Sequence, residues 1–547
     1  MCGIFAYLFN NEGKISMNQR SKIINSAVKS QHRGPDTTEF VTYDDRVCLC
    51  FHRLAIMDKS KSGNQPISLR DSPNQVLVCN GEIYNFKKLA EKYDFELESG
   101  SDCEIVLHMI KRFGIEETVK QLDGVFAFIY YDMDTNVIHV ARDPFGVRAL
   151  YMGLTGDGDA VFASEMKSID ELVATCDQFP PGNYMTVHSD SEERNYNPIS
   201  YYDFHYPYTK IKSQTEYVME TTRIIYEERV RKLLEKAVDK RLMSERPIGC
   251  LLSGGLDSSL VTALVARHFP RGELKTFSIG LPGSEDLRYA RLVADHLGTD
   301  HHEVVVSEKQ MLKFIEKDIY QIETYDTTTI RASVPMLMLS HYIQAYTDIK
   351  VVYSGEGSDE ASGSYLYFHN APTPDAFHDE CTRLLKDMHM YDVLRCDKST
   401  AGAGLEVRVP FLDLDFIDYY MSIPPEFKMP HKGIEKYLLR KAFDGLDLLP
   451  KEVLWRMKEG FSDGCSSKSR SWYEIIQEWV ETRITDEEFE AEAPTYYNPP
   501  KFKEALYYRR VFSKLFNERD NTVPYYWLPK WSGDISEPSA RVLKVYE

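Results

Sequence analysis

Residues 248–259 read IGCLLSGGLDSS, a short apolar run that leads into a loop of small residues. Apolar residues recur after it at helical spacing, from Leu260 to Val265, so the stretch predicts a strand, a tight turn and a helix. Small residues at such a turn let backbone N–H groups approach an anion, and the helix N-terminus adds a favourable dipole. No Gly-Lys-Ser/Thr is present, so this is not a Walker A loop. A small-residue turn without a ligand is the alternative interpretation.

The same pattern continues beyond this loop. Apolar runs typical of buried strands occupy 276–281 and 351–353, and amphipathic helices are expected at 222–242 and 258–268. A second loop, residues 354–360 (SGEGSDE), follows its own apolar run as the first loop does. Strands that alternate with helices predict an α/β fold, a parallel sheet covered on both faces. Ligands of such sheets bind at the carboxyl ends of the strands, where both loops are expected.

The residues before about position 200 have a different pattern. Turn residues such as Asn80-Gly81 and Asp143-Pro144 separate short apolar runs. Strands grouped with a few helices predict an α+β domain. We expect strands at 76–79, 125–131 and 137–141, and helices at 19–29 and 103–113.

The change of pattern divides the chain. We expect an α+β domain at 2–190, a polar and aromatic linker at 191–215, and an α/β domain at 216–547. The residues from Gly464 onward are polar and give little structural signal.

Composition excludes several functional classes. The 547 residues contain 65 Lys and Arg against 84 Asp and Glu, a formal net charge of −19. That balance argues against nucleic-acid and anionic-membrane partners, because phosphate contacts need clustered cations. No apolar run approaches the roughly 18 residues of a membrane span, and the N-terminus does not resemble a signal peptide. The 10 cysteines form no C-x-x-C pair, so we expect reduced thiols in a cytoplasmic protein. A homodimer remains open.

Cys2 has its own chemical possibility. Removal of Met1 would make Cys2 the first residue, with its thiol and α-amine on adjacent carbons. The amine has a pKa of about 7.7–8.0 and the thiol about 8.5, so the amine can take the thiol proton near neutral pH. This is a nucleophile with a built-in base. An inert thiol is the alternative.

A series of motifs favours the catalytic interpretation. Its members, in order, are Cys2-Gly3-Ile4, His32-Arg33-Gly34-Pro35-Asp36, His52-Arg53-Leu54-Ala55-Ile56, Asn80-Gly81-Glu82-Ile83-Tyr84-Asn85, Ser101-Asp102-Cys103-Glu104 and Ala141-Arg142-Asp143-Pro144-Phe145-Gly146. This series resembles the class II glutamine amidotransferases, a family of N-terminal-nucleophile hydrolases, and the resemblance implies a sandwich fold for residues 1 to about 190. A hairpin turn at Asn80-Gly81 and a helix cap at Asp102 are the separate alternatives.

The resemblance implies a glutaminase site. Cys2 would attack the glutamine side-chain amide, and the Asn80 side chain with the Gly81 amide would stabilise the oxyanion. Arg53 would bind the α-carboxylate and Asp102 the α-ammonium. Glu82 and backbone groups of Leu54 and Ile56 would complete the pocket. Ammonia and glutamate would be the products.

The second half carries a second resemblance. The loop Ser253-Gly254-Gly255-Leu256-Asp257-Ser258-Ser259 looks like the pyrophosphate loop of the ATP pyrophosphatases. Further motifs extend the likeness: Ile322 to Arg331 (IETYDTTTIR), Glu406 to Asp413 (EVRVPFLD) and Lys458 to Gly464 (KEGFSDG). Together with the first half, the chain resembles the asparagine synthetase family. That implies synthesis of asparagine from aspartate, ATP and glutamine, through β-aspartyl-AMP, with release of AMP, pyrophosphate and glutamate.

The second resemblance also assigns residues. Glu356 would help form or use the acyl-adenylate, Lys458 would neutralise charge at the α-phosphate, and Arg331 is a candidate ligand of aspartate or phosphate. Asp257 and Asp359 would hold Mg²⁺, which bridges pyrophosphate oxygens. The expected ATP contacts are Leu252, Ser253, Gly254, Gly255, Asp257, Ser258, Ile279, Ser354 and Gly355.

Two segments depart from the family pattern. Residues 361–364 (ASGS) and 401–404 (AGAG) are smaller than usual, and we expect them to loosen the synthetase pocket. A β-lactam synthetase-like enzyme shares the architecture but needs no glutaminase, so the intact Cys2 motif series argues against it. A non-catalytic regulatory relative should have lost Cys2 or an acidic loop. A simple glutaminase leaves the second half unexplained.

Overall fold

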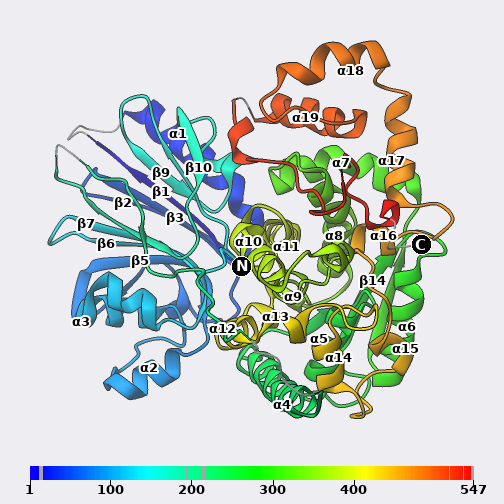
Figure 1. Cartoon of the computed structure of the whole chain (residues 1–547). Coiled ribbons are helices and arrows are strands. Elements are labelled where there is room, and N and C mark those ends of the chain that lie inside the picture. The colour runs from blue at the N-terminus through cyan, green and yellow to red at the C-terminus, as the bar shows by residue number, and fades with distance from the viewer. Residues whose placement is uncertain (11–15, 192–193, 211–215, 517, 534, 544–547) are drawn as a thin grey trace.

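The protein is described by a computed structural model that covers residues 1–10, 16–191, 194–210, 216–516, 518–533 and 535–543. The expected linker falls partly outside these described residues, at 192–193 and 211–215, as does the expected end of the second domain at 544–547. Figure 1 shows a β-sandwich of N-terminal residues beside a larger part in which helices surround a sheet.

The first sheet of the sandwich is antiparallel and has the order β10-β8-β9-β1-β3-β2. β1 is central because Gly3 pairs with His52 on one side while Phe5 pairs with Ala163 on the other. Its strands are β1 (Gly3–Leu8), β2 (Thr37–Tyr43), β3 (Val47–Arg53), β8 (Tyr151–Leu154), β9 (Ala160–Ala163) and β10 (Thr175–Gln178).

The second sheet is also antiparallel and has the order β12-β11-β7-β6-β5-β4. Asn80 and Gly81 lie inside β5, paired with Ala127 and Phe126, so the turn expected at Asn80-Gly81 is wrong. The strands are β4 (Ile67–Leu69), β5 (Ser72–Ile83), β6 (Gly124–Asp132), β7 (Val137–Arg142), β11 (Asn183–His188) and β12 (Ile199–Ser200).

Alternating side chains of the two sheets form the sandwich core. Ile4 and Leu49 of the first sheet share a buried cluster with Val78 and Ile129 of the second. The opposite face of the second sheet packs against α3 (Glu104–Gln121), which is kinked at Gly114 (φ 75°). Two more helices, α1 (Met17–Ala27) and α2 (Phe86–Tyr93), complete this part. The expected α+β sandwich is confirmed.

The larger part contains a five-stranded parallel sheet with the order β15-β14-β13-β16-β17. β13 and β16 are adjacent and parallel, so the loops that follow them are neighbours at the carboxyl edge of the sheet. This is the edge at which α/β sheets bind ligands. The expected α/β fold is confirmed. The strands are β13 (Ile248–Leu251), β14 (Lys275–Gly280), β15 (Asp300–Val305), β16 (Val351–Tyr353) and β17 (Glu406–Arg408).

Helices pack around this sheet, and the expected ones at 222–242 and 258–268 begin earlier than predicted. No helix among the described residues is long and apolar enough to cross a membrane. The helices are α4 (Glu216–Lys240), α5 (Leu256–Ala266), α6 (Glu285–Leu297), α7 (Glu308–Ile322), α8 (Thr327–Tyr346), α9 (Ser358–Ser362), α10 (Pro374–Asp387), α11 (Asp392–Ala401), α12 (Leu414–Ser422), α13 (Pro425–Lys428), α14 (Tyr437–Phe443), α15 (Lys451–Leu454), α16 (Phe461–Gly464), α17 (Trp472–Glu481), α18 (Asp486–Glu492) and α19 (Lys503–Leu515).

The residues that gave little sequence signal are therefore largely structured. α17 to α19 form the upper part of the molecule in Figure 1. α17 and α18 both begin with complete capping boxes, at Ser471 with Glu474 and at Thr485 with Glu488. Such reciprocal bonds satisfy free amides at a helix start. α17 also buries an apolar face formed by Trp472, Ile475, Ile476 and Val480.

Candidate active sites

Cys2 immediately precedes β1 and packs against both the sandwich core and a small cluster that includes Val351 of β16. Its backbone N–H donates to Asn80 Oδ1 at 2.9 Å, and the Leu54 N–H donates to its Sγ at 3.5 Å. All ten cysteines are free, and Cys2 is the one that is not fully buried. The thiol is thus fixed by two neighbouring segments, Asn80 of β5 and Leu54 after β3.

Asn80 contacts Cys2 from β5, and Gly81 follows it on the same strand. Asn80 Oδ1 holds Cys2, whereas Asn80 Nδ2 is buried with no hydrogen-bond partner among the described residues. A buried donor without a partner is costly unless a ligand or water satisfies it. A Cβ on Gly81 would lie 2.4 Å from the Val125 carbonyl oxygen, so no side chain fits there. The strand therefore brings an available donor next to the thiol.

Arg53 and Asp102, the residues expected to bind the charged groups of glutamine, are each held by the chain. Arg53 is buried and donates to the Ser60 carbonyl at 2.8 Å and to the Asp58 carbonyl, which fixes its guanidinium. Asp102 Oδ2 accepts from the Ile83 N–H at 2.6 Å, so Asp102 does not cap α3. Burial, opposed by that hydrogen bond, raises the pKa of Asp102 to about 7.

Glu82 and the backbone groups expected in the pocket lie nearby. Glu82 is buried, with Oε2 3.4 Å from Arg408 of β17. Burial, followed by the charges of Glu406 and Asp102, raises the pKa of Glu82 well above its ordinary value. Leu54 and Ile56 pack in one small cluster with Val351, at the boundary with the parallel sheet.

Met1 blocks the built-in base of Cys2. The Met1 side chain is fully buried, and its ammonium lies 3.5 Å from Glu406 Oε2. While Met1 is attached, the Cys2 nitrogen is an amide and cannot accept a proton. Burial then raises the pKa of the Cys2 thiol to about 11. Removal of Met1 would supply the missing base.

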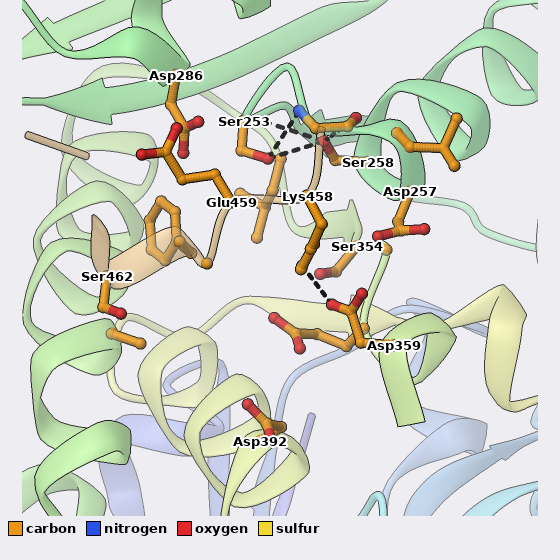
Figure 2. Close-up of a pocket in the computed structure, with 18 of the residues that line it drawn as sticks. Ser253, Asp257, Ser258, Asp286, Ser354, Asp359, Asp392, Lys458, Glu459 and Ser462 are labelled. Atoms are coloured by element: carbon orange, nitrogen blue, oxygen red, sulfur yellow. Dashed lines mark hydrogen bonds and ion pairs between the residues drawn. The ribbon is translucent and has the colours of Figure 1, made fainter. Parts of the chain in front are cut away.

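A pocket lies at the carboxyl edge of the parallel sheet, and Figure 2 shows a close-up of it with residues of its lining drawn as sticks. It brings together nearly all the residues expected for the second site: Leu252, Ser253, Gly255, Asp257, Ser258, Ile279, Ser354, Gly355, Glu356, Asp359 and Lys458. Gly254 is outside the lining. Its φ is +72°, and a Cβ there would lie 2.4 Å from the Ala290 amide nitrogen, so it serves the turn and the packing on α6.

The two loops contact each other directly. A Cβ on Gly355 would lie 2.6 Å from the Ser258 nitrogen. Ser253 N–H donates to Ser258 Oγ at 3.2 Å, which closes the first loop over the start of α5. The N-cap residue of α5, Gly255, has no side chain to satisfy the first amides of the helix. A phosphate is the kind of ligand that such amides bind.

Four charges converge at the mouth of the loops. Lys436 Nζ lies 2.6 Å from Asp257 Oδ2 and 2.5 Å from Asp359 Oδ1. Lys458 Nζ lies 2.6 Å from Asp359 Oδ2, as the dashed line in Figure 2 shows. Burial would raise the pKa of Asp359, but Lys436 and Lys458 hold it far below its usual range.

This donor set fits a magnesium ion that arrives with phosphate. Asp257 and Asp359 already point their oxygens at one common cation position, which the ammonium of Lys436 occupies. Mg²⁺ is typically held by one or two carboxylates plus substrate phosphates. No group of three or more metal-binding side chains occurs among the described residues.

Glu356 lies in the pocket with a cationic partner. Arg395 of α11 places Nη2 3.0 Å from Glu356 Oε2 and 3.1 Å from Asp392 Oδ1. Burial, opposed by Arg395, raises the pKa of Glu356. A carboxylate with a raised pKa is better suited to accept and hold a proton near neutral pH.

Arg331, the candidate ligand of aspartate or phosphate, lies outside this lining. Its guanidinium is buried and makes four hydrogen bonds, two to Glu504 and two to Glu537. It borders a smaller neighbouring pocket instead. Two carboxylates already neutralise it, so it anchors α19 and the C-terminal segment in this structure.

Several residues of the pocket lining were not predicted from the sequence. Lys436 and Arg395 lie far along the chain from both loops and belong to no recognisable motif, yet both contact acidic residues of those loops. Trp527, in a polar and irregular segment, lines both pockets. Only packing in three dimensions could identify them.

The small-residue segments do not loosen the pocket. Neither 361–364 nor 401–404 contributes to its described lining. At Gly363 (φ +59°) a Cβ would lie 2.3 Å from Phe377 Cζ, and at Gly402 it would lie 2.9 Å from Leu337 Cδ1. Small residues are needed there because the neighbouring side chains fill the space.

Comparison with known proteins gives full-length matches. Family models match as a glutamine amidotransferase domain over residues 1–201 and as asparagine synthase over residues 229–375 and 370–537. Glutamine-hydrolysing asparagine synthetases from Gallus gallus, Cricetulus griseus and Homo sapiens are 43%, 41% and 41% identical to the chain. Each alignment covers 100% of this chain and 99% of the relative.

Proposed function

The chain belongs to the family of glutamine-hydrolysing asparagine synthetases, and on that premise we propose that it makes asparagine through β-aspartyl-AMP, releasing AMP, pyrophosphate and glutamate. The observation that carries the proposal is the convergence of Asp257, Glu356, Asp359 and Lys458 around one pocket. The same chain holds a free thiol at Cys2, in contact with Asn80, whose Nδ2 is a buried donor without a partner among the described residues. The proposed division is a glutaminase at 2–190, a linker at 191–215 and a synthetase at 216–547.

In the first half-reaction, Cys2 attacks the side-chain amide of glutamine. After Met1 is removed, the α-amine of Cys2 takes the thiol proton and later returns it to the departing ammonia. Asn80 Nδ2 and the Gly81 amide stabilise the oxyanion, while Arg53 and Asp102 hold the α-carboxylate and α-ammonium of the substrate. Water then hydrolyses the thioester to glutamate.

In the second half-reaction, the aspartate side-chain carboxylate attacks the α-phosphorus of ATP. The amides at the start of α5 bind phosphate, and Lys458 balances the charge that develops there. Asp257 and Asp359 would hold Mg²⁺, which supplies neutralisation of the pyrophosphate when it is bound. Glu356 accepts the proton that ammonia loses as it displaces AMP.

Product analysis tests this function. The purified enzyme with glutamine, aspartate, ATP and Mg²⁺ should form asparagine, glutamate, AMP and pyrophosphate in equal amounts. Formation of ADP, or glutamate release without any nucleotide consumption, contradicts the proposal. Intact mass should show Cys2 as the first residue of the active enzyme.

The Cys2→Ala variant tests whether glutamine hydrolysis and adenylation take place at two separate sites. The variant should lose glutamine-dependent synthesis and keep synthesis from ammonium chloride, because adenylation is assigned to the second half. Loss of both activities in a folded variant would mean that the two half-reactions are not separate.

A further inference from the structure

Helix α11 touches both candidate sites. In Figure 1 it lies beside the chain's N-terminus, between the sandwich and the larger part. All ten of its residues are buried or half-buried, and four of them are charged. Asp392 and Arg395 face the synthetase pocket, whereas Asp397 and Lys398 contact residues of the glutaminase part.

On the glutaminase side, Arg33 joins the helix to the nucleophile. Arg33 Nε donates to the carbonyl oxygen of Cys2 at 2.9 Å, and Arg33 Nη2 donates to Asp397 Oδ2 at 2.7 Å. A third bond, from Nη1 to Glu165 at 2.5 Å, fixes the guanidinium plane. Arg33 and Asp397 are almost fully buried, so neither can exchange its partner for water.

On the synthetase side, the same helix orients the proposed proton acceptor. Asp397 is only two residues from Arg395, which lies 3.0 Å from Glu356. The backbone of α11 sets the spacing between these two side chains. Three residues, Arg33, Asp397 and Arg395, therefore connect the backbone of Cys2 to the carboxylate of Glu356, with the helix backbone as the link between Asp397 and Arg395.

We propose that α11 couples the two active sites, with Arg33, Asp397 and Arg395 as positioning residues between Cys2 and Glu356. The inference rests on the proposed function and extends it, because it assigns the coupling to named contacts. Formation of the acyl-enzyme at Cys2 shifts the carbonyl that Arg33 holds. A buried charge pair resists separation, so Asp397 and its helix follow the guanidinium, and Arg395 moves relative to Glu356.

The test compares two Asp-to-Asn changes at the same interface. Asp397→Asn removes the charge that holds Arg33 and should raise the ratio of glutamate released to asparagine formed by about two- to thirtyfold, the range typical of mutations between coupled sites. Synthesis from ammonium chloride should persist. Asp170→Asn is the matched control, because Asp170 pairs with buried Arg519 at 2.6 Å across the interface but contacts neither site.

Each outcome decides the question. A ratio that stays within about twofold of wild type in Asp397→Asn, or rises equally in Asp170→Asn, overturns the proposal. If Asp397→Asn does not fold, Arg33→Lys replaces it, since Lys cannot hold Cys2, Glu165 and Asp397 together. A double-mutant cycle of Arg33→Gln with Asp397→Asn should be non-additive in the ratio. A wild-type enzyme that makes no asparagine from either nitrogen source would instead refute the proposed function.

Discussion

Glu356 combines burial with a cationic neighbour, and this combination determines how it can act. Burial favours its protonated form and Arg395 favours its ionised form, with burial stronger. Glu356→Gln keeps the size and the hydrogen bond to Arg395 but cannot accept a proton. We expect asparagine formation from either nitrogen source to fall by about 10²- to 10⁴-fold, the usual contribution of a general base.

The measurement for Glu356→Gln follows AMP and glutamate release separately. Glutamate release from glutamine should continue, because the thiol site does not contain Glu356. Asparagine formation at the wild-type rate would remove Glu356 from the chemistry.

Asp102 gives the glutaminase a pH dependence. Only the ionised carboxylate can bind the α-ammonium of glutamine, and burial raises the pKa of Asp102 to about 7. The kcat/KM for glutamine should therefore fall as the pH is lowered through about 7, since the neutral acid cannot pair with the ammonium. The Asp102→Asn variant should have a lower kcat/KM for glutamine at every pH, without the decrease near pH 7. If the variant shows the same decrease at the same pH, the titrating group is a residue other than Asp102.

Residues inside a motif could be proposed from the sequence. Asn80 and Glu356 lie in recognisable motifs, and the structure places Asn80 in contact with Cys2 and Glu356 in the lining of the pocket. Lys436 has no such context, and Arg331 has the motif but is bound to Glu504 and Glu537, which come from polar segments far along the chain. Their roles depend on contacts that sequence spacing does not encode.

At the scale of elements, the loops after β13 and β16 depend on a close backbone approach. Gly355→Ala would place a Cβ 2.6 Å from the Ser258 nitrogen and 2.8 Å from the Asp257 carbonyl carbon. Both are backbone atoms, so the loops must separate, at a cost of about 1–3 kcal/mol. We expect loss of ATP-dependent AMP formation with retained glutaminase activity.

Gly156→Ala is the control for this prediction, because a Cβ there meets nothing within 4 Å. Both variants are assayed for pyrophosphate release with aspartate present. If the Gly355→Ala variant released pyrophosphate at the wild-type rate, the loops would tolerate separation.

Strands and helices with clear periodicity were predictable, and their ends were less so. The strand at Val351–Tyr353 was predicted at its observed limits, whereas β5 extends well beyond 76–79 because its neighbour β6 continues the pairing. The helices after Gly464 were not predicted, although α17 buries Trp472, Ile475, Ile476 and Val480 at helical spacing. For α18, which buries none of its residues, the capping box is the local signal.

At the scale of the whole molecule, buried charges join the two parts. Lys167 and Lys398 each lie within ion-pair distance of Glu165 and Glu323, and all four side chains are nearly inaccessible to water. Lys398→Met keeps the length of the side chain but leaves excess buried negative charge. We expect a loss of about 3–5 kcal/mol in stability, as for other broken buried pairs.

Urea denaturation followed by tryptophan fluorescence and by activity measures this loss. Lys210→Met is the control, since Lys210 pairs with Asp375 at the surface, and should leave the midpoint unchanged. Equal midpoints for both variants would show that the interdomain charges contribute no stability. The two fold classes were predictable from the sequence, but this interface was not, because its partners come from opposite halves of the chain.

Lys436 acts as a resident counter-ion between Asp257 and Asp359. A metal cation that binds with the nucleotide would therefore compete with the Lys436 ammonium for the carboxylates of Asp257 and Asp359. Free divalent ions gain little by entering alone, since they meet carboxylates that are already neutralised. Nucleotide phosphates change that balance, because they offer the displaced ammonium a new anionic partner. If the proposed function holds, the lysine would favour binding of the metal together with the nucleotide over binding of a bare metal ion.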